Sequence, residues 1–264
     1  MAVVGGVWLF VDILSSFKVI NKEKLTLWYL IPIIILGLII VIITRRPVKK
    51  ISYKYPGQDL TIEVCIGNLF DVPGQKVIST NTTFDTDIAS GIISPRSLQG
   101  QFTEKFFPSN LPALDEALNK GLQDLPKSHI QKEAGKTERY DFGTTVKLNL
   151  SGQFFYWFAM ADLNHSNNAK TTLKNVHQAL DGLWEFIETK GERLPTVIPL
   201  IGTGLGRLRT SRKKLIAIIA QSFINASEDN IFSEKLIIVV HPSDVESSGL
   251  NLFEVKDLLH HYLP

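Results

Sequence analysis

The stretch VIPLIGTGLGR at residues 197–207 decides the fold, because an apolar run stops there at a glycine-rich loop. Residues 196–201 have the β-branched bias of a buried strand, and residues 210–226 repeat apolar side chains at helical spacing. Glycines let a loop approach a ligand closely, and a helix that follows directs unpaired N–H groups at an anion, so the loop suits a phosphate or diphosphate. An ordinary connection with flexible glycines is the alternative, since the spacing matches neither G-x-G-x-x-G nor G-x-x-x-x-G-K-[ST].

Strands and helices alternate through most of the chain beyond residue 58. The patterns predict further strands at 60–66, 76–80, 144–150, 153–161 and 235–240, and further helices at 113–122, 171–190 and 252–262. This alternation predicts an α/β fold with a mostly parallel or mixed sheet and helices on both faces. Ligands bind such sheets where the strands end.

Residues 25–43 form an uncharged run of 19 residues. At about 1.5 Å per residue, a helix of this length nearly crosses a hydrocarbon core of about 30 Å. Trp28 and Tyr29 stand at its start, where interface anchors are common. We therefore predict a transmembrane helix here.

A second apolar segment, residues 2–20, is interrupted by Asp12. It lacks the basic start of a cleavable signal peptide. We interpret residues 1–46 as a two-helix transmembrane hairpin and residues 47–57 as a linker to a domain at 58–264. Asp12 near the middle of a membrane is costly when it faces lipid, so it is a functional candidate that faces a partner helix or water. A shallow span that places Asp12 near one interface is the alternative.

The charges orient the hairpin and limit the partners. Five basic residues lie between 45 and 54, with no acidic residue until Asp59, so the following domain is predicted to be cytoplasmic. Residues 1–54 hold eight basic and two acidic side chains, which leaves 20 basic and 24 acidic ones for residues 55–264, a formal charge of −4. Such a domain is a poor candidate for binding nucleic acid. The single cysteine, Cys65, excludes intrachain disulfides and a cysteine-rich zinc site.

Two further segments complete an ordered set of motifs. Residues 77–87 read VISTNTTFDTD, a strand that ends in Asn81 and a polar loop, and residues 97–102 read SLQGQF, at a helix start. Together with the later strand that ends in Gly-Thr-Gly-Leu-Gly, these motifs resemble those of macro domains, which bind ADP-ribose. The resemblance covers residues 58–264 and implies a three-layer α/β/α sandwich with a mixed sheet. With two predicted transmembrane helices before it, the chain is similar to the membrane-anchored macro-domain effectors of type II Thoeris antiphage systems.

The resemblance assigns ligand contacts to four segments. Gly67-Asn68-Leu69-Phe70 stands where macro domains have Gly-Asp-Ile-Thr, so Asn68, with Leu69 beside it, keeps an acceptor for the adenine amino group but lacks the charge. Asn81 matches the asparagine near the far ribose. Contacts are also implied for the insert after Asn81 and for the loop that wraps the diphosphate: Phe84, Asp85, Leu98, Gln99, Gly100 and Gln101, then Gly202, Thr203, Gly204, Leu205, Gly206 and Arg207.

The sequence departs from the macro-domain pattern after Asn81. The usual run of glycines is missing, and a longer insert, residues 84–101, takes its place. This departure argues against ADP-ribosyl hydrolysis and favours recognition of a group attached to the ribose. We therefore expect no catalytic residues, no metal and no cofactor, and the spacing of His165, His177 and His241 does not suggest a metal site.

Two functions remain open. In the first, a multi-pass protein of the bacterial inner membrane binds an ADP-ribose derivative, expected to be histidine-ADP-ribose, that a partner TIR-domain enzyme makes from NAD. Binding then drives homo-oligomerisation and disruption of the lipid bilayer, an abortive infection. In the second, a membrane-tethered hydrolase removes ADP-ribosyl groups. A neighbouring TIR gene favours the first, and turnover of an ADP-ribosylated substrate favours the second.

Overall fold

The computed structural model describes residues 48–165, 168–202, 208 and 210–263, and within the first 47 residues only 5, 9, 12, 13, 15–17, 31 and 35–39. The chain divides into two units, Met1–Val48 and Lys49–Pro264. A search of the described residues finds no helix with the length and apolarity needed to cross a membrane. Most of the predicted hairpin, residues 1–46, lies outside the described residues, so the hairpin stays a prediction.

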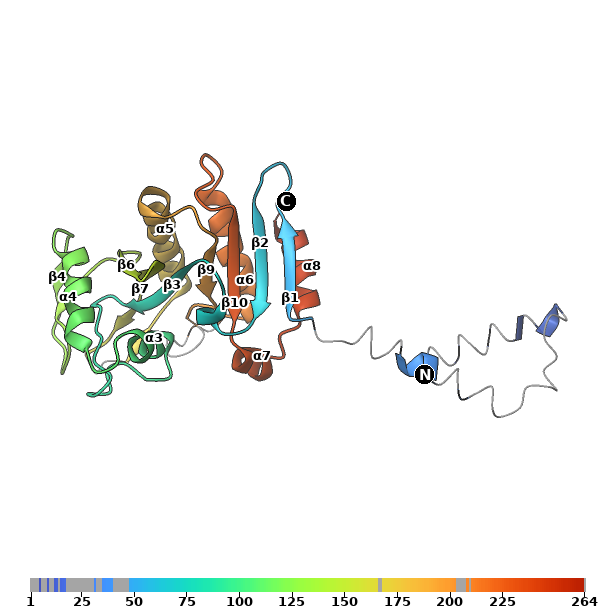
Figure 1. Cartoon of the computed structure of the whole chain (residues 1–264), viewed down its shortest axis with the longest axis horizontal. Helices are drawn as coiled ribbons and strands as arrows, with labels where there is room; N and C mark the ends of the chain where they lie inside the picture. The colour runs from blue at the N-terminus through green and yellow to red at the C-terminus, as the bar shows by residue number, and fades with distance from the viewer. Residues whose placement is uncertain are drawn as a thin grey trace. The chain divides into compact units, whose positions relative to one another are not determined.

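The second unit contains the strands and helices of an α/β domain (Figure 1). In chain order they are β1 (Lys50–Lys54), β2 (Thr61–Ile66), η3 (Leu69–Asp71), β3 (Gln75–Asn81), α3 (Leu98–Phe106), α4 (Leu111–Leu122), β4 (Ser128–His129), β5 (Glu138–Arg139), β6 (Thr145–Leu150), β7 (Gln153–Leu163), β8 (Ala169–Lys170), α5 (Leu173–Lys190), β9 (Thr196–Pro199), α6 (Arg212–Ala226), β10 (Lys235–Val240), α7 (Pro242–Ser248) and α8 (Leu252–Tyr262).

The main sheet has the strand order β1-β2-β10-β9-β3-β7-β6, and β8 pairs with the end of β7. The five strands from β2 to β7 in this order run parallel to one another. The edge strands β1 and β6 run antiparallel to their neighbours. The prediction of an α/β fold with a mixed sheet is therefore confirmed.

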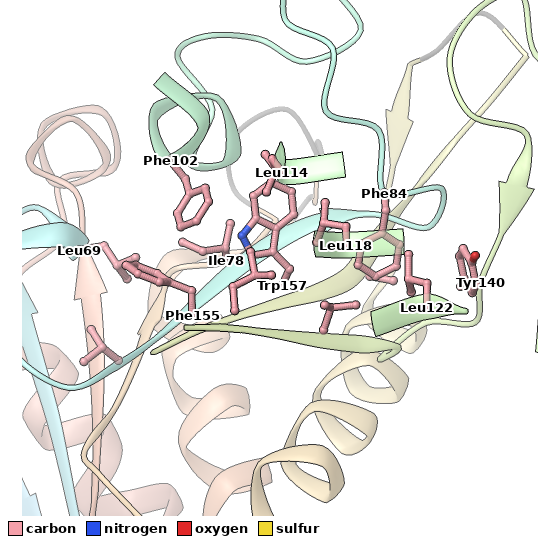
Figure 2. Packing of buried hydrophobic residues seen from close by; sticks show 14 of the residues in the cluster. Leu69, Ile78, Phe84, Phe102, Leu114, Leu118, Leu122, Tyr140, Phe155 and Trp157 are labelled. Carbon is pink, nitrogen blue, oxygen red and sulfur yellow. The ribbon is translucent and has the colours of Figure 1, made fainter. Parts of the chain in front are cut away.

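Strand β7 shows how the sheet buries both faces. Its residues alternate in direction, as in any strand, so neighbours along the chain reach opposite layers. Phe155 and Trp157 contact Phe102 of α3 at ring distances of 4.9 and 5.2 Å, whereas Tyr156 meets Phe186 of α5 at 6.2 Å. Figure 2 shows the first of these layers, where α3 and α4 close over the sheet. An aromatic run such as this one is thus the centre of a sheet with helices on both sides.

Helix α5 follows directly from its sequence pattern. Thr172 accepts a hydrogen bond from Asn175 N and caps the start of the helix, and Gly191 follows its end. The buried residues fall at spacings of three and four: Val176, Ala179, Leu180, Leu183, Trp184 and Ile187. The predicted amphipathic helix is therefore present.

The structure corrects the predicted linker at residues 47–57. Residues 50–54 form β1, which pairs antiparallel with β2, so the domain begins before residue 58. Ile51 and Tyr53 point inward and are buried, while the lysines at the two ends of the strand stay accessible. Tyr53 Oη also donates a hydrogen bond to Leu263 O at 2.7 Å, which ties the strand to the end of α8. Lysines at 49, 50 and 54 gave this stretch the composition of a solvated linker.

Candidate functional site at the carboxyl edge of the sheet

The parallel strands bring predicted contact segments to one edge of the sheet. Because β2, β10, β9, β3 and β7 run in the same direction, their carboxyl ends share that edge. Asn68 follows β2, Asn81 ends β3 and Gly202 follows β9. The ends of β2 and β10 are joined directly, since Gly67 N donates to Val240 O at 3.0 Å. The motifs that are far apart in the sequence therefore lie along one edge of the sheet.

Asn68 caps the short helix η3. Its Oδ1 accepts a hydrogen bond from Phe70 N at 3.0 Å, and its side chain is exposed. The adjacent Leu69 side chain is 4% exposed and packs in the core, so a ligand contact at Leu69 would come from its main chain. This corner offers a capped turn with an amide on its surface.

The glycine loop begins with a backbone conformation that favours glycine. Gly202 has φ +73°, and its carbonyl accepts a hydrogen bond from Leu208 N at 3.1 Å. Ser211 then caps α6 by accepting a hydrogen bond from Lys214 N. The predicted contacts from Thr203 to Arg207 lie outside the described residues. The order of strand, glycine turn and capped helix around them agrees with the sequence analysis.

Asn81 organises the loop that follows β3. Its Oδ1 accepts hydrogen bonds from Thr83 N at 3.0 Å and Asp85 N at 3.2 Å, and it lies 2.8 Å from Thr83 Oγ1. Asparagine suits this position because a short side chain with an acceptor can satisfy the backbone of a tight turn. The loop is therefore held by Asn81 itself, and the side chain is 5% exposed.

Asp85 is buried in an ion pair with Lys132. Lys132 Nζ lies 2.6 Å from Asp85 Oδ2, and the two side chains are 0% and 2% exposed. Asp85 Oδ1 accepts a further hydrogen bond from Lys136 N at 2.6 Å. Both carboxylate oxygens are thus engaged by the segment between β4 and β5.

The same segment, residues 130–137, fits closely over the loop. Lys136 Nζ donates to Phe84 O at 2.8 Å and pairs with Asp115 of α4 at 2.6 Å. Gly135 has φ +90°, and a Cβ atom there would overlap Asp85 Oδ1. Residues 130–137, which we call the hairpin tip because they connect the paired strands β4 and β5, therefore cover the loop that follows Asn81.

Phe84 is a core residue in this structure. Its side chain is fully buried and meets the Tyr140 ring edge-on at 5.7 Å, although its φ of +49° is unusual for a bulky residue. The structure therefore places the Phe84 side chain in the core, and the ligand contact expected of Phe84 stays a prediction. The hydrogen bond from Lys136 to its carbonyl helps to stabilise the left-handed conformation.

Tyr140 gives this region a pH dependence. Burial, followed by the nearby Glu138 carboxylate, raises the pKa of Tyr140 to about 12. In the unfolded chain the phenol ionises near pH 10, so between about pH 10 and 12 the unfolded state binds fewer protons and stability falls as the pH rises. We expect Tyr140→Phe to reduce this loss, in unfolding curves recorded across that alkaline range. An unchanged alkaline slope in the variant would exclude Tyr140 as its source.

The start of α3 supplies the remaining predicted residues. Thr80 Oγ1 donates to Gln99 Oε1 at 3.0 Å, and Gln99 Nε2 donates to Asp85 O, so Gln99 joins β3 to the loop. Gly100 packs so closely on residues 94 and 95 that a Cβ atom would overlap Ser94 O. Leu98 is half-buried against the core, and Gln101 Nε2 donates to Arg96 O at 3.1 Å. Gln99 and Gly100 therefore hold the loop and the helix start in position, and neither presents a free side chain to a ligand.

Sequence reasoning missed Lys132, Lys136 and Asp115. Lys132 is 47 residues from Asp85, and no period or motif connects them. The available signals were a glycine flanked by two lysines, at residues 132–136, and an aspartate without a local basic partner.

Solved structures identify the class of fold. A mutant form of the macrodomain of Oceanobacillus iheyensis superposes with a TM-score of 0.52 at 17% identity, covering 82% of this chain and 98% of that one. The same organism's macrodomain with ADP gives a TM-score of 0.50 at 16% identity, with 79% and 98% covered. The domain therefore has the macro-domain fold.

The sequence comparisons specify the family. Residues 62–241 match the family described as Thoeris protein ThsA, Macro domain. The Thoeris protein ThsA of Bacillus amyloliquefaciens (strain Y2) is 26% identical over 241 residues, covering 86% of this chain and 78% of that protein. The chain belongs to the Thoeris ThsA macro-domain family.

Proposed function

We propose that this chain is a membrane-anchored effector of bacterial antiphage defence whose cytoplasmic macro domain binds an ADP-ribose-derived signal. A partner TIR-domain enzyme makes the signal from NAD, and histidine-ADP-ribose is the expected form. Binding causes copies of the chain to assemble, and the assembled anchors disrupt the membrane. The two-helix hairpin at residues 1–46 is the anchor, with Asp12 facing a partner helix or water.

The observation that supports this function most directly is the common edge of the sheet. Asn68, Asn81 and Gly202 come from three separate segments and lie at the carboxyl ends of parallel strands, in a chain of the Thoeris ThsA macro-domain family. A ligand that extends along this edge meets the exposed amide of Asn68, then the glycine turn at Gly202, and then the loop that Asn81 holds. A diphosphate between two ribose groups has the matching order of parts.

The loop after Asn81 supports a receptor over a hydrolase. A general base needs a carboxylate or imidazole that can reach the reacting water. Asp85 is the acidic residue nearest to Asn81 in the sequence, and Lys132, Thr83 and the Lys136 main chain occupy its oxygens. A buried carboxylate held in this way serves as a rigid part of the site and not as a base. We therefore propose that the group attached to the ribose of the signal lies against the hairpin tip.

Mass spectrometry of the purified full chain tests this function. We expect an ADP-ribose-bearing compound to co-purify from cells with an active TIR partner, and not from cells whose TIR enzyme is inactive. Incubation of the loaded chain, followed by chromatography, should return the ligand intact. Release of free ADP-ribose at a catalytic rate would instead establish the hydrolase, and the absence of any ADP-ribose compound in both samples would contradict the receptor.

A further inference from the structure

A groove of about 770 Å³ lies on the helical layer formed by α5, α6 and α8. Apolar side chains from all three helices line it, with Trp184 from α5, Ala217 and Ile218 from α6, and Leu258 and Tyr262 from α8. Trp184 Nε1 donates to Ser222 Oγ at 2.8 Å, which fixes the indole between α5 and α6. The groove is therefore a shaped apolar surface on the helical layer, and none of the residues that line it is a predicted ligand contact.

The groove is acidic along α5 and basic at the start of α6. Asp181, Glu185 and Glu188 lie at spacings of four and three on α5, so they form one acidic stripe. Lys213 and Lys214 lie in the first turn of α6 and form a basic end of the groove, since the other α6 residues that line it are uncharged. In the part of the chain that the structure describes, Asp181, Glu185 and Lys214 form no ion pair, whereas Lys213 pairs with Glu254. Charges of both signs thus line different places in one groove.

One exposed aromatic residue, Tyr262, lies in the groove with these charges. Over residues 48–165, 168–202 and 210–263, the large hydrophobic side chains with high exposure are Leu194 at 40%, Phe253 at 51% and Tyr262 at 61%. Two of the three belong to α8, and Tyr262 also lines the groove. Aromatic residues of this kind are enriched at protein interfaces, where they contribute much of the binding energy.

We propose that this groove is the surface through which a second copy of the chain binds. Homodimers commonly have two-fold symmetry, and a two-fold axis that crosses the groove exchanges its two ends, so the basic end of one copy lies against the acidic stripe of the other, twice. The charge pattern is therefore self-complementary, and the apolar floor with Tyr262 is buried between the copies. The proposal rests on the proposed function for the assembly itself and names the surface that carries it.

The position of α8 gives this surface a connection to the anchor. Tyr53 of β1 donates a hydrogen bond to Leu263 O and packs edge-on against His260 of α8 at 4.9 Å. β1 is the first strand after the N-terminal unit, so α8 is fixed to the strand that continues from the proposed hairpin. Pairing through α8 therefore acts on the strand nearest in sequence to the anchor.

Charge reversal in the acidic stripe and at the basic end of the groove tests the proposal. The full chain, purified in detergent, is examined by analytical ultracentrifugation with ADP-ribose and with histidine-ADP-ribose as probes. We expect Glu185→Lys alone and Lys214→Glu alone to weaken self-association by about tenfold or more, since like charges then meet twice. An equimolar mixture of the two variants should regain self-association, because each reversed residue then faces a residue of opposite charge. Glu104→Lys, on the exposed side of α3 in the other layer, is the matched control.

The mixture separates a lost interface from a misfolded variant. Single variants that assemble like the parent, or a mixture that fails to regain assembly, would overturn the second copy as the occupant of the groove. A parent chain that binds a probe and never assembles would contradict both this surface and the assembly in the proposed function. Failure of both probes to bind would count against the ligand assignment, while self-association of the parent still tests the surface.

Discussion

Replacing Lys132 with methionine is expected to lower the free energy of unfolding by about 3–5 kcal/mol, because it leaves the Asp85 carboxylate buried without its cation. Lys132 has no exposed side-chain surface and Asp85 has 2%, so water cannot replace the lost partner without opening the hairpin tip. Denaturant unfolding followed by tryptophan fluorescence measures the change, since Trp157 and Trp184 are buried in the two layers.

Lys127→Met is the matched control for this prediction. Lys127, which directly precedes β4, pairs with Glu138 of β5 at 2.7 Å, but the two side chains are 37% and 44% exposed. Exposed pairs of this kind contribute about 0–1 kcal/mol, so the control should change stability little. Equal effects of the two substitutions would show that burial of the Asp85–Lys132 pair does not determine how much the pair contributes to the free energy of unfolding.

The double variant Lys132→Met with Asp85→Leu adds a second test. Removing both charges takes away the unpaired carboxylate, so we expect this chain to recover a large part of the loss caused by Lys132→Met. The hydrogen bonds from Lys136 N and Thr83 Oγ1 to Asp85 are lost as well, so recovery should be incomplete. No recovery at all would assign the loss to packing of the lysine chain.

The second large effect is expected at the glycine loop. Replacing Gly204 with phenylalanine should weaken binding of an ADP-ribose-type ligand by about 100-fold or more, because the ring takes the space that the diphosphate needs close to the backbone. Unfolding curves should change little, since the predicted role of Gly204 is contact with ligand. Asp229→Phe is the control, as it puts the same ring in the exposed loop before β10, at the amino end of the strands.

Calorimetric affinity for histidine-ADP-ribose distinguishes the outcomes for Gly204. An affinity equal to that of the parent would show that the loop 202–207 is an ordinary connection. Loss of affinity together with loss of folding would contradict the assignment of Gly204 as a specific ligand contact.

Periodicity predicted the elements that bury a regular face. α5 has six buried residues on one stripe and a threonine cap, and β10 is a continuous apolar strand, so both were evident from local pattern. β1 was missed because its two buried residues alternate with polar ones, and only its pairing with β2 and the Tyr53 contact to Leu263 fixes it as a strand. A half-buried edge strand of five residues has too short an alternating pattern to be recognised from the sequence.

The site was predictable to the extent that it consists of strand ends. Asn68, Asn81 and Gly202 were placed by motif order, and parallel pairing brings their strands to a common edge. Lys132 could not be placed in this way, since it reaches Asp85 through a fold-dependent contact across 47 residues. For the same reason Phe84 was assigned to the ligand, although tertiary packing puts its ring against Tyr140.

Titration calorimetry of the full chain with ADP-ribose and with histidine-ADP-ribose tests the central claim most directly. We expect saturable binding of one molecule per chain, with tighter binding of histidine-ADP-ribose, because its added group reaches the wall formed by the hairpin tip. NAD, which carries the same diphosphate with a different terminal group, is the matched comparison. Saturable binding of histidine-ADP-ribose by the folded parent chain would support a receptor, and the absence of binding by every ADP-ribose compound would contradict it.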